Sequence, residues 1–436
     1  MHRRLMLLIS LALIGALLSS CSGTATDTTV LSASTSTTTG VAPTTAPSTT
    51  TTTTGSVGGV DPSVAAALRT TIEDLMVATE NIRGLDFKED PIITIVTEDE
   101  LAARVRKLIE DELDPEETAR DERLMKLLGI LDPSADLAAL YGDLYSEQVA
   151  GYYDGETDEL VVPATDDDLT GLQRLTMVHE LTHALTDQYF DFHDLGDILD
   201  EEERFEEGGA LQALVEGDAT FVEALFFNTA LSSSEQAAIF DEFEEVETSV
   251  FDSAPSFMTD LLVFPYNRGA AFVGGLWQSG RFEAVNAAYD DPPLTTEQII
   301  HPALYQVEDA VAVDLPDTPV DGYENAEESV WGQLGLEALF SQSLGSIADN
   351  ASRGWGGDRY RVLWDGERVV FVLSWVGDES ADADEMMEAW QALIDEQMPP
   401  DSYVFVGRSG DSVVFIAADD PDAGASVRGA FADFAG

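Results

Sequence analysis

The residues best suited to chemistry in this sequence are His179, Glu180 and His183, which form an HExxH motif. On a helix, two histidines four residues apart lie one above the other on the same face, so both imidazoles can reach one metal ion. Glu180 lies about 100° round the helix from His179 and can lean over a water molecule held by that ion. We therefore expect a zinc site with His179 and His183 as ligands and Glu180 as the catalytic base.

The segment around the motif is predicted to be a buried helix. Apolar residues recur there at three- and four-residue steps between Leu169 and Leu185. The acidic run 166–168 just before it would provide the N-cap and suits the positive end of the helix dipole. Burying three titratable side chains without partners would be costly, and a metal ion is a suitable partner for them.

A catalytic zinc site needs a third protein ligand. A metzincin would have glycine at position 186 and histidine at position 189, whereas this chain has Thr186 and Tyr189. A second apolar helix, predicted over residues 208–231, carries Glu216, which resembles the downstream glutamate of gluzincins and is the expected third ligand. Asp218 on the same helix is expected to accept a hydrogen bond from a ligand histidine.

Three other residues remain open as alternatives to Glu216: Asp218, Glu223 and His193. Glu223 shares the face of Glu216 two turns further on, and His193 follows the motif helix. Thr220 stands where thermolysin-like families place an aspartate behind the ligands, so close kinship with thermolysin is not expected.

Small residues next to the expected ligand carry a further prediction. Gly217 and Ala219 would allow the second helix to pack closely against the motif helix.

Ahead of the motif, two β-prone runs around an Asp154-Gly155 turn predict a hairpin. In proteins of the zincin type, the strand at the edge of the cleft binds extended substrate as an added strand. We assign that role to residues 150–153, with plain sheet packing as the alternative.

Zinc peptidases also use a donor opposite the metal to stabilise the oxyanion of the tetrahedral intermediate, usually histidine or tyrosine. His301 is the first candidate for this role, followed by Tyr266 and Arg268. A structural histidine in a turn beside Pro302 is the alternative interpretation of His301.

The N-terminus predicts export. Residues 1–20 combine a basic start with a short apolar run, which is typical of a signal peptide. The sequence Leu18-Ser19-Ser20-Cys21 resembles a bacterial lipobox, which implies cleavage before Cys21 and lipidation at that residue. An ordinary secretory signal is the alternative. Since Cys21 is the only cysteine, we expect a lipid-anchored protein that works at the bacterial cell surface without disulfides.

The rest of the chain divides by composition and pattern. Residues 21–60 are rich in threonine and serine and predict a disordered tether. Residues 61–350 would form a mostly helical zincin-like domain with a small mixed sheet before the motif helix. Residues 351–436 show two hairpins, each followed by a helix, and predict an antiparallel ββα-ββα lobe. The expected fold class is therefore α+β.

The charge of the chain excludes one class of partner. The sequence has 83 acidic and 21 basic residues, a formal net charge of −62. Such a surface repels nucleic acids and anionic lipid headgroups. An ordinary solvated acidic surface is the default interpretation, and adaptation to high salt or to divalent cations such as Ca²⁺ is the alternative.

Several segments together resemble a family of secreted bacterial HExxH lipoproteins regarded as gluzincin-like zinc metallopeptidases. The resemblance spans about residues 90 to 380 and rests on these segments: 150–154 (AGYYD), 179–188 (HELTHALTDQ), 214–220 (LVEGDAT), 296–302 (TEQIIHP) and 354–360 (GWGGDRY). It implies a zinc-dependent peptidase acting on a peptide or protein substrate. The alternatives are a non-catalytic envelope or binding lipoprotein, whose structural or vestigial zinc would be completed by His193 or Asp218, and a calcium-dependent surface protein.

Overall fold

The computed structural model describes residues 55–436 except 57–58, 147–150, 167 and 247. The predicted signal peptide, Cys21 and most of the predicted tether lie outside the described residues. The tether was predicted to extend to residue 60, but Gly55–Ser56 form the short strand β1. Its two residues pair in parallel with Thr94 and Ile95.

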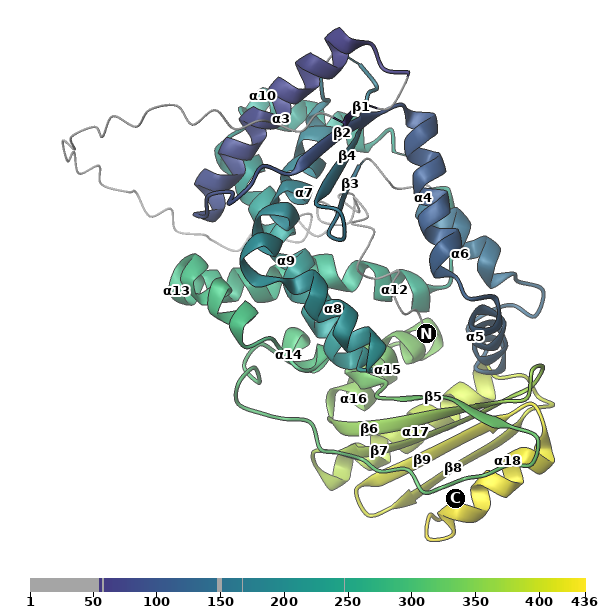
Figure 1. Ribbon diagram of the computed structural model, residues 1–436. Helices are drawn as coiled ribbons and strands as arrows, with labels where there is room; N and C mark the ends of the chain where they lie inside the picture. The colour runs from purple at the N-terminus through teal and green to yellow at the C-terminus, as the bar shows by residue number, and fades with distance from the viewer. Residues whose placement is uncertain (1–54, 57–58, 147–150, 167, 247) are drawn as a thin grey trace.

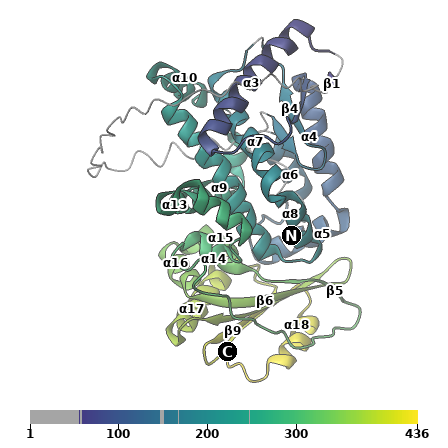
Figure 2. The same cartoon turned by 60° about the vertical axis from the view of Figure 1, so that its left-hand side comes forward.

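The described chain has the α+β fold expected from the sequence, with two sheets at opposite ends of the molecule (Figures 1 and 2). The first is a mixed sheet that precedes the motif helix, as predicted, and its strand order is β1-β2-β4-β3. Strands β1, β2 and β4 run parallel, while β3 pairs with β4 in the antiparallel sense and lies at the edge. The bounds of the last three strands are β2 Ile92–Val96, β3 Tyr152–Asp154 and β4 Glu159–Pro163.

Helices α3, α7 and α9 pack against one another beside this sheet. Helix α3 (Pro62–Arg83) begins at an Asp61 cap and ends at Gly84, which has the left-handed backbone that favours glycine. Helix α7 (Gly171–Phe190) contains the HExxH motif, and α9 (Phe205–Thr229) crosses it. Helix α8 (Phe192–Glu201) lies between α7 and α9 in the sequence.

The start of α7 differs from the prediction. Its N-cap is Thr170, whose hydroxyl accepts a hydrogen bond from the backbone of Gln173, while the Gln173 side chain accepts one from the backbone of Thr170. The carboxylate of Glu242 accepts from the first two N–H groups of the helix. The prediction that the acidic run 166–168 caps this helix was therefore wrong. Asp168 instead forms an ion pair with Arg174.

Most of the remaining helices surround α9 or connect the two sheets. Helices α10 and α11 follow α9 in the sequence, and a π-helical turn, η2, precedes α13. The bounds are α4 Glu98–Glu112, α5 Pro115–Leu127, α6 Leu137–Ser146, α10 Ser233–Phe243, α11 Ser249–Ser253, α12 Ser256–Phe264, η2 Pro265–Gly269, α13 Ala270–Asp290 and α14 Thr296–Ile300.

The second sheet is antiparallel, with the order β5-β6-β7-β9-β8. Two ββα units make up most of it, as the alternating pattern predicted. A fifth strand, β5, comes from ahead of residue 351, where the lobe was predicted to begin. The bounds are β5 Glu324–Ser329, α15 Gly332–Leu344, α16 Ser346–Arg353, β6 Trp355–Trp364, β7 Val369–Gly377, α17 Ser380–Glu396, β8 Tyr403–Ser409, β9 Ser412–Ala418, α18 Pro421–Arg428 and the short 3-10 helix η3 Gly429–Phe431.

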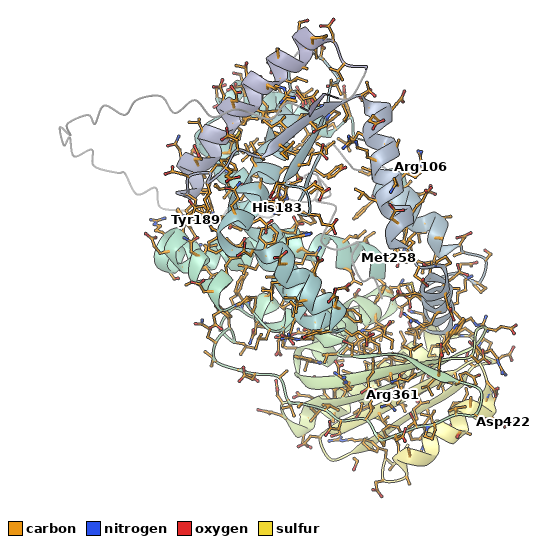
Figure 3. The ribbon with its side chains drawn as sticks, viewed as in Figure 1. Arg106, His183, Tyr189, Met258, Arg361 and Asp422 are labelled. Atoms are coloured by element: carbon orange, nitrogen blue, oxygen red, sulfur yellow. The ribbon has the colours of Figure 1, made fainter. Side chains whose placement is uncertain are left out.

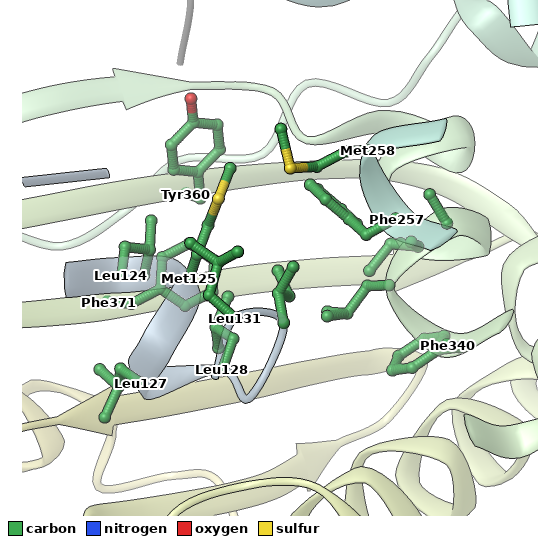
Figure 4. Close-up of a cluster of buried hydrophobic side chains, with 14 of the residues drawn as sticks. Leu124, Met125, Leu127, Leu128, Leu131, Phe257, Met258, Phe340, Tyr360 and Phe371 are labelled. Carbon is green, nitrogen blue, oxygen red and sulfur yellow. The ribbon is translucent and has the colours of Figure 1, made fainter. Parts of the chain in front are cut away.

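One apolar core joins the second sheet to the helical part. Figure 4 shows Leu124 and Met125 of α5 close to Phe371 of β7, with Phe257 of α12 and Phe340 of α15 beside them. All five side chains are buried. Burial of this size stabilises by roughly 1.5–3 kcal/mol per large apolar side chain, so the two parts support each other's folding. Among the described residues, no helix combines the length and apolar character needed to cross a membrane.

A buried carboxyl group, Glu206 at the start of α9, lies where α14 and α15 meet. Its Oε1 accepts hydrogen bonds from the backbone N–H and the hydroxyl of Thr296, at 2.6 and 2.8 Å. Burial raises the pKa of Glu206 to about 8, although the bonds from Thr296 oppose the shift and the charges of Asp358 and Glu297 add to it.

Glu206→Gln is expected to make the stability less sensitive to alkali. Because the folded pKa lies above the ordinary value of 4.5, the neutral acid contributes stability that is fully present below pH 4.5 and is lost as the pH rises through 8. The loss is on the order of 3–5 kcal/mol. Glutamine keeps the acceptor oxygen and does not ionise, so thermal unfolding between pH 5 and 9 should show a smaller fall in Tm for the variant. Glu207→Gln, on the neighbouring surface pair with Arg204, is the control. Parallel Tm curves for wild type and Glu206→Gln would contradict this prediction.

Candidate metal centre and active site

Three donor atoms from α7 and α9 converge in the interior of the protein. His179 Nε2 lies 3.0 Å from Glu216 Oε2 and 3.0 Å from His183 Nε2. His183 Nε2 lies 3.3 Å from the same oxygen of Glu216. All three residues are buried. Figure 3 shows His183 between α7 and α9. The structure thus brings the two motif histidines together with the carboxylate expected as third ligand.

The geometry of this cluster fits a zinc ion. Donor atoms placed about 2.0–2.1 Å from zinc in a tetrahedral arrangement lie about 3.3–3.4 Å from one another. The three observed separations, 3.0, 3.0 and 3.3 Å, require only small adjustments to match. Two imidazoles and one carboxylate are also a donor set that zinc prefers. Three protein donors leave a fourth position for water or substrate, as a catalytic site requires.

The electrostatics of the cluster shift the pKa values of Glu216 and His179 in opposite directions. Burial works against ionisation of Glu216, but the neighbouring charges and hydrogen bonds of His183 and His179 lower its pKa to about 2. Burial disfavours the charged form of His179, yet its bonds to Glu216 and Glu223 raise its pKa to about 10. Both shifts favour an imidazolium–carboxylate pair when no metal is bound. Binding zinc would replace the proton on His179 and release it.

Glu180 lies beside this cluster and is fully buried. Its Oε2 accepts a hydrogen bond of 2.9 Å from the backbone N–H of Tyr153, in the edge strand β3. Its Oε1 accepts no hydrogen bond from the described residues. Burial raises the pKa of Glu180 to about 7, against the opposing charges of His179 and His183. One oxygen is therefore held by the edge strand, and the other is buried without a partner among the described residues.

The carboxylate on the far side of the His179 ring is not the predicted one. Glu223 Oε2 lies 3.5 Å from Nδ1 of His179, where it favours this orientation of the ring. The sequence analysis treated Glu223 only as a rival ligand. The signal that could have found its role is its position two turns after Glu216 on one face of α9, which lets both carboxylates reach the two nitrogens of His179.

Asp218 was expected to bond a ligand histidine, and that expectation was wrong. Its Oδ2 lies 3.0 Å from Nε of Arg83 and accepts a hydrogen bond of 3.2 Å from the hydroxyl of Tyr289. Arg83 and Asp218 are both fully buried. Since residues two apart on a helix point about 200° apart, Asp218 faces α3 and α13 while Glu216 faces α7. The buried ion pair therefore ties α9 to α3.

Gly217 packs against η2 and not against the motif helix as predicted. A Cβ atom on Gly217 would lie 2.2 Å from the carbonyl carbon of Gly269, and one on Gly269 would lie 2.0 Å from the carbonyl oxygen of Ala213. The two backbones are thus in direct contact. The contact lies at the end of the π-helical turn, a feature often found at functional sites, which also carries Tyr266.

The predicted oxyanion donors have different surroundings. Tyr266 is buried, and its ring stacks on that of His179 with a centroid separation of 6.0 Å. His301 follows α14, and its Nε2 lies 3.2 Å from the side-chain nitrogen of Gln333. Partial burial and the charges of Arg353 and Arg268 lower the pKa of His301. Of the predicted donors, Tyr266 is therefore one that the structure brings against His179.

A half-open cavity of about 140 Å³ lies along the same face of α9 as Glu216. Gln212 on its wall is one turn before Glu216, and Gly208 is one turn further back. Phe257 and Leu261 of α12 contribute apolar walls. The cavity is large enough for one side chain and is lined mostly by carbon. No sequence pattern indicated it, because its walls come from distant parts of the chain.

The comparisons with known proteins match only parts of this chain. A family model described as a domain of unknown function (DUF8575) matches residues 318–428, which include the second sheet and α15 to α18. A comparison with curated proteins finds no match. A crystal structure from Chloroflexus aurantiacus, described as a "putative hydrolase with a novel fold", is similar over 56% of this chain and 90% of its own, at 16% identity and a TM-score of 0.37. That likeness is too weak to carry an argument about fold or activity.

Proposed function

We propose that this protein is a zinc-dependent peptidase of the gluzincin-like HExxH class, which hydrolyses peptide bonds at the bacterial cell surface. The observation that carries the proposal is the convergence of His179, His183 and Glu216 at separations that suit zinc, with Glu180 beside them. The lipid anchor at Cys21 remains part of the proposal on sequence grounds.

The residues around the cluster have distinct roles in this reaction. Zinc held by His179, His183 and Glu216 would supply Lewis acidity to the attacking water and to the scissile carbonyl. Glu180 takes a proton from the water through its unbonded Oε1 and later delivers it to the leaving amine. Tyr266, beside His179, is placed to assist the developing oxyanion. Strand β3 supplies an edge along which an extended peptide can align, next to the backbone N–H that holds Glu180.

The alternative of a closed, structural zinc site finds less support. It would need a fourth protein ligand, for which Asp218 or His193 was considered. Asp218 is bonded to Arg83 and Tyr289, and His193 lies in a separate group with Glu156 and Asp197. Three ligands with an open position favour a catalytic site.

Glu180→Gln tests the proposal directly. The variant should keep the zinc content of the wild type, because Glu180 is not a ligand, and should lose hydrolysis by about 10²–10⁴-fold, because glutamine cannot accept the proton. Cleavage of a mixed peptide pool, followed by mass spectrometry, together with metal analysis of the same samples, gives both readouts. Hydrolysis that persists in Glu180→Gln, or a wild type that binds zinc but cleaves no peptide in the pool, would favour the binding lipoprotein.

The apolar cavity predicts a preference for a large apolar side chain in the substrate. Gly208 lines it, and a Cβ atom at this position would meet nothing within 4 Å. Gly208→Phe should therefore fill the cavity without displacing backbone and lower kcat/KM by about 10–100-fold for peptides with a bulky apolar residue, while sparing those with alanine there. Gly208→Ala is the control and should behave as wild type. Equal losses of kcat/KM for both peptide classes would show that the cavity does not bind a substrate side chain.

A further inference from the structure

His193 was considered as a zinc ligand in the sequence, and the structure places it in a different cluster. It lies in the first turn of α8, directly after the motif helix. A nitrogen of its ring, an oxygen of Glu156 and one of Asp197 all lie within 4.8 Å of one another. Glu156 belongs to the turn between β3 and β4, and Asp197 is one helical turn after His193 on α8. The group therefore bridges two elements that are distant in sequence.

The ring of His193 has an unmet requirement. The residue is only 8% exposed, and its buried Nε2 atom has no hydrogen-bond partner among the residues that the structure describes. The closest carboxylate oxygen recorded for it, on Asp197, is 4.0 Å away, which is too far for a hydrogen bond. A buried polar atom without a partner costs about 1–3 kcal/mol. A cation placed between the two carboxylates and this nitrogen would satisfy all three groups.

The surroundings hold the histidine ring in place. A Cβ atom on Gly155 would lie 2.8 Å from the ring, so the hairpin turn covers it closely. The backbone N–H of His193 donates to Asp187, whose other carboxylate oxygen accepts a hydrogen bond from the hydroxyl of Tyr153. Asp158 in the same turn also accepts from that hydroxyl. The turn therefore covers the ring while the backbone of the residue is held by Asp187, and the surrounding carboxylates would attract a cation.

We propose that Glu156, His193 and Asp197 form a second zinc-binding site, which fastens the β3–β4 turn to α8. A nitrogen donor with two carboxylates suits zinc and disfavours calcium, which takes oxygen ligands. The 4.0 Å separation of His193 and Asp197 must shorten by somewhat less than 1 Å to reach the tetrahedral value. Glu156 is exposed and Asp197 partly exposed, so both side chains can move. Fixing the side chains of Glu156 and Asp197 around an ion costs conformational entropy. This site therefore binds zinc more weakly than the site of His179, His183 and Glu216.

The consequence for the molecule follows from the position of the turn. Strand β3 ends in this turn and carries the backbone N–H that holds Glu180. An ion between the turn and α8 would therefore restrain the edge strand without contacting the catalytic residues. The inference does not depend on the peptidase activity, because it concerns separate ligands.

Zinc titration of chelator-treated protein, followed by calorimetry, tests the second site. The wild type should bind two equivalents of zinc, one tight and one weaker, and Glu216→Ala should keep only the weaker one. His193→Ala should keep only the tight one, and its backbone bond to Asp187 does not depend on the side chain. The double variant Glu216→Ala/His193→Ala should bind none. Asp197→Asn, a mild change on a partly exposed residue, should weaken the second equivalent by about tenfold or more.

The outcomes separate the two sites. The second site would be overturned if the wild type bound only one equivalent of zinc and lost it in Glu216→Ala. It would also be overturned if a second equivalent of zinc survived in both His193→Ala and Asp197→Asn. A single equivalent that depends on His193 and not on Glu216 would support it and reject the first site together with the peptidase. Calcium chloride in place of zinc is the matched probe, and calcium binding that depends on Asp197 but not on His193 would overturn the assignment to zinc. Circular dichroism of each variant verifies that the fold is retained.

Discussion

Glu216→Ala should weaken zinc binding by about 100-fold or more, because the change removes one of only three protein donors. The carboxylate also carries the negative charge that balances the ion among the buried histidines. Titration of chelator-treated protein with zinc, in competition with a chelator of known affinity, measures the effect. The same samples should lose peptide hydrolysis in proportion to their lost zinc.

Glu223 provides the matched control for this prediction, because it lies on the same helix face and touches the same histidine without reaching the ion. Glu223→Ala removes the support at Nδ1 of His179, 3.5 Å away, and should cost about 10–100-fold in zinc affinity. A larger loss of zinc affinity in Glu223→Ala than in Glu216→Ala would indicate that Glu223 is the ligand and Glu216 the supporting residue. Unchanged zinc affinity in Glu216→Ala would show that the cluster does not hold the ion as proposed.

Gly217→Ala is expected to have the largest effect on stability. The added Cβ would lie 2.2 Å from the backbone of Gly269, where no flexible side chain can move aside, so α9 and η2 must separate. Overpacking of this kind costs typically 1–3 kcal/mol, and contact with backbone on both sides places this case at about 3 kcal/mol. The corresponding fall in Tm is about 4 °C for a cooperative unit of this size. Because Tyr266 belongs to η2, the tyrosine should also shift away from His179.

A glycine elsewhere in the same region is the control. Gly275 in α13 is exposed, and a Cβ atom there would meet nothing within 4 Å. Gly275→Ala should therefore be neutral or stabilise slightly, since alanine favours the helix over glycine by about 0.5–1 kcal/mol. Gly269→Ala should resemble Gly217→Ala, and the two together should cost less than their sum because they disturb one contact. A Tm for Gly217→Ala equal to that of Gly275→Ala would contradict the close-contact interpretation.

Local patterns in the sequence predicted much of the fold. The periodicity of apolar residues and the turn at Asp154-Gly155 between β3 and β4 depend only on neighbours along the chain. The class and the positions of most elements agree with these predictions. The boundaries agree less well where tertiary contacts contribute, as at the start of α7, where Glu242 of a distant helix accepts from the first N–H groups.

The sequence by itself predicted the kind of site: two histidines and a glutamate on one turn of a buried helix, whose spacing suits zinc. Only the tertiary structure showed which acidic residue of α9 lies against both histidines, because that helix is buried on nearly all sides and its periodicity marks no single face. Glu216, Asp218 and Glu223 are all buried. The rotation of α9, fixed by the Gly217 contact and the bond to Arg83, directs Glu216 and Glu223 to His179 and turns Asp218 away.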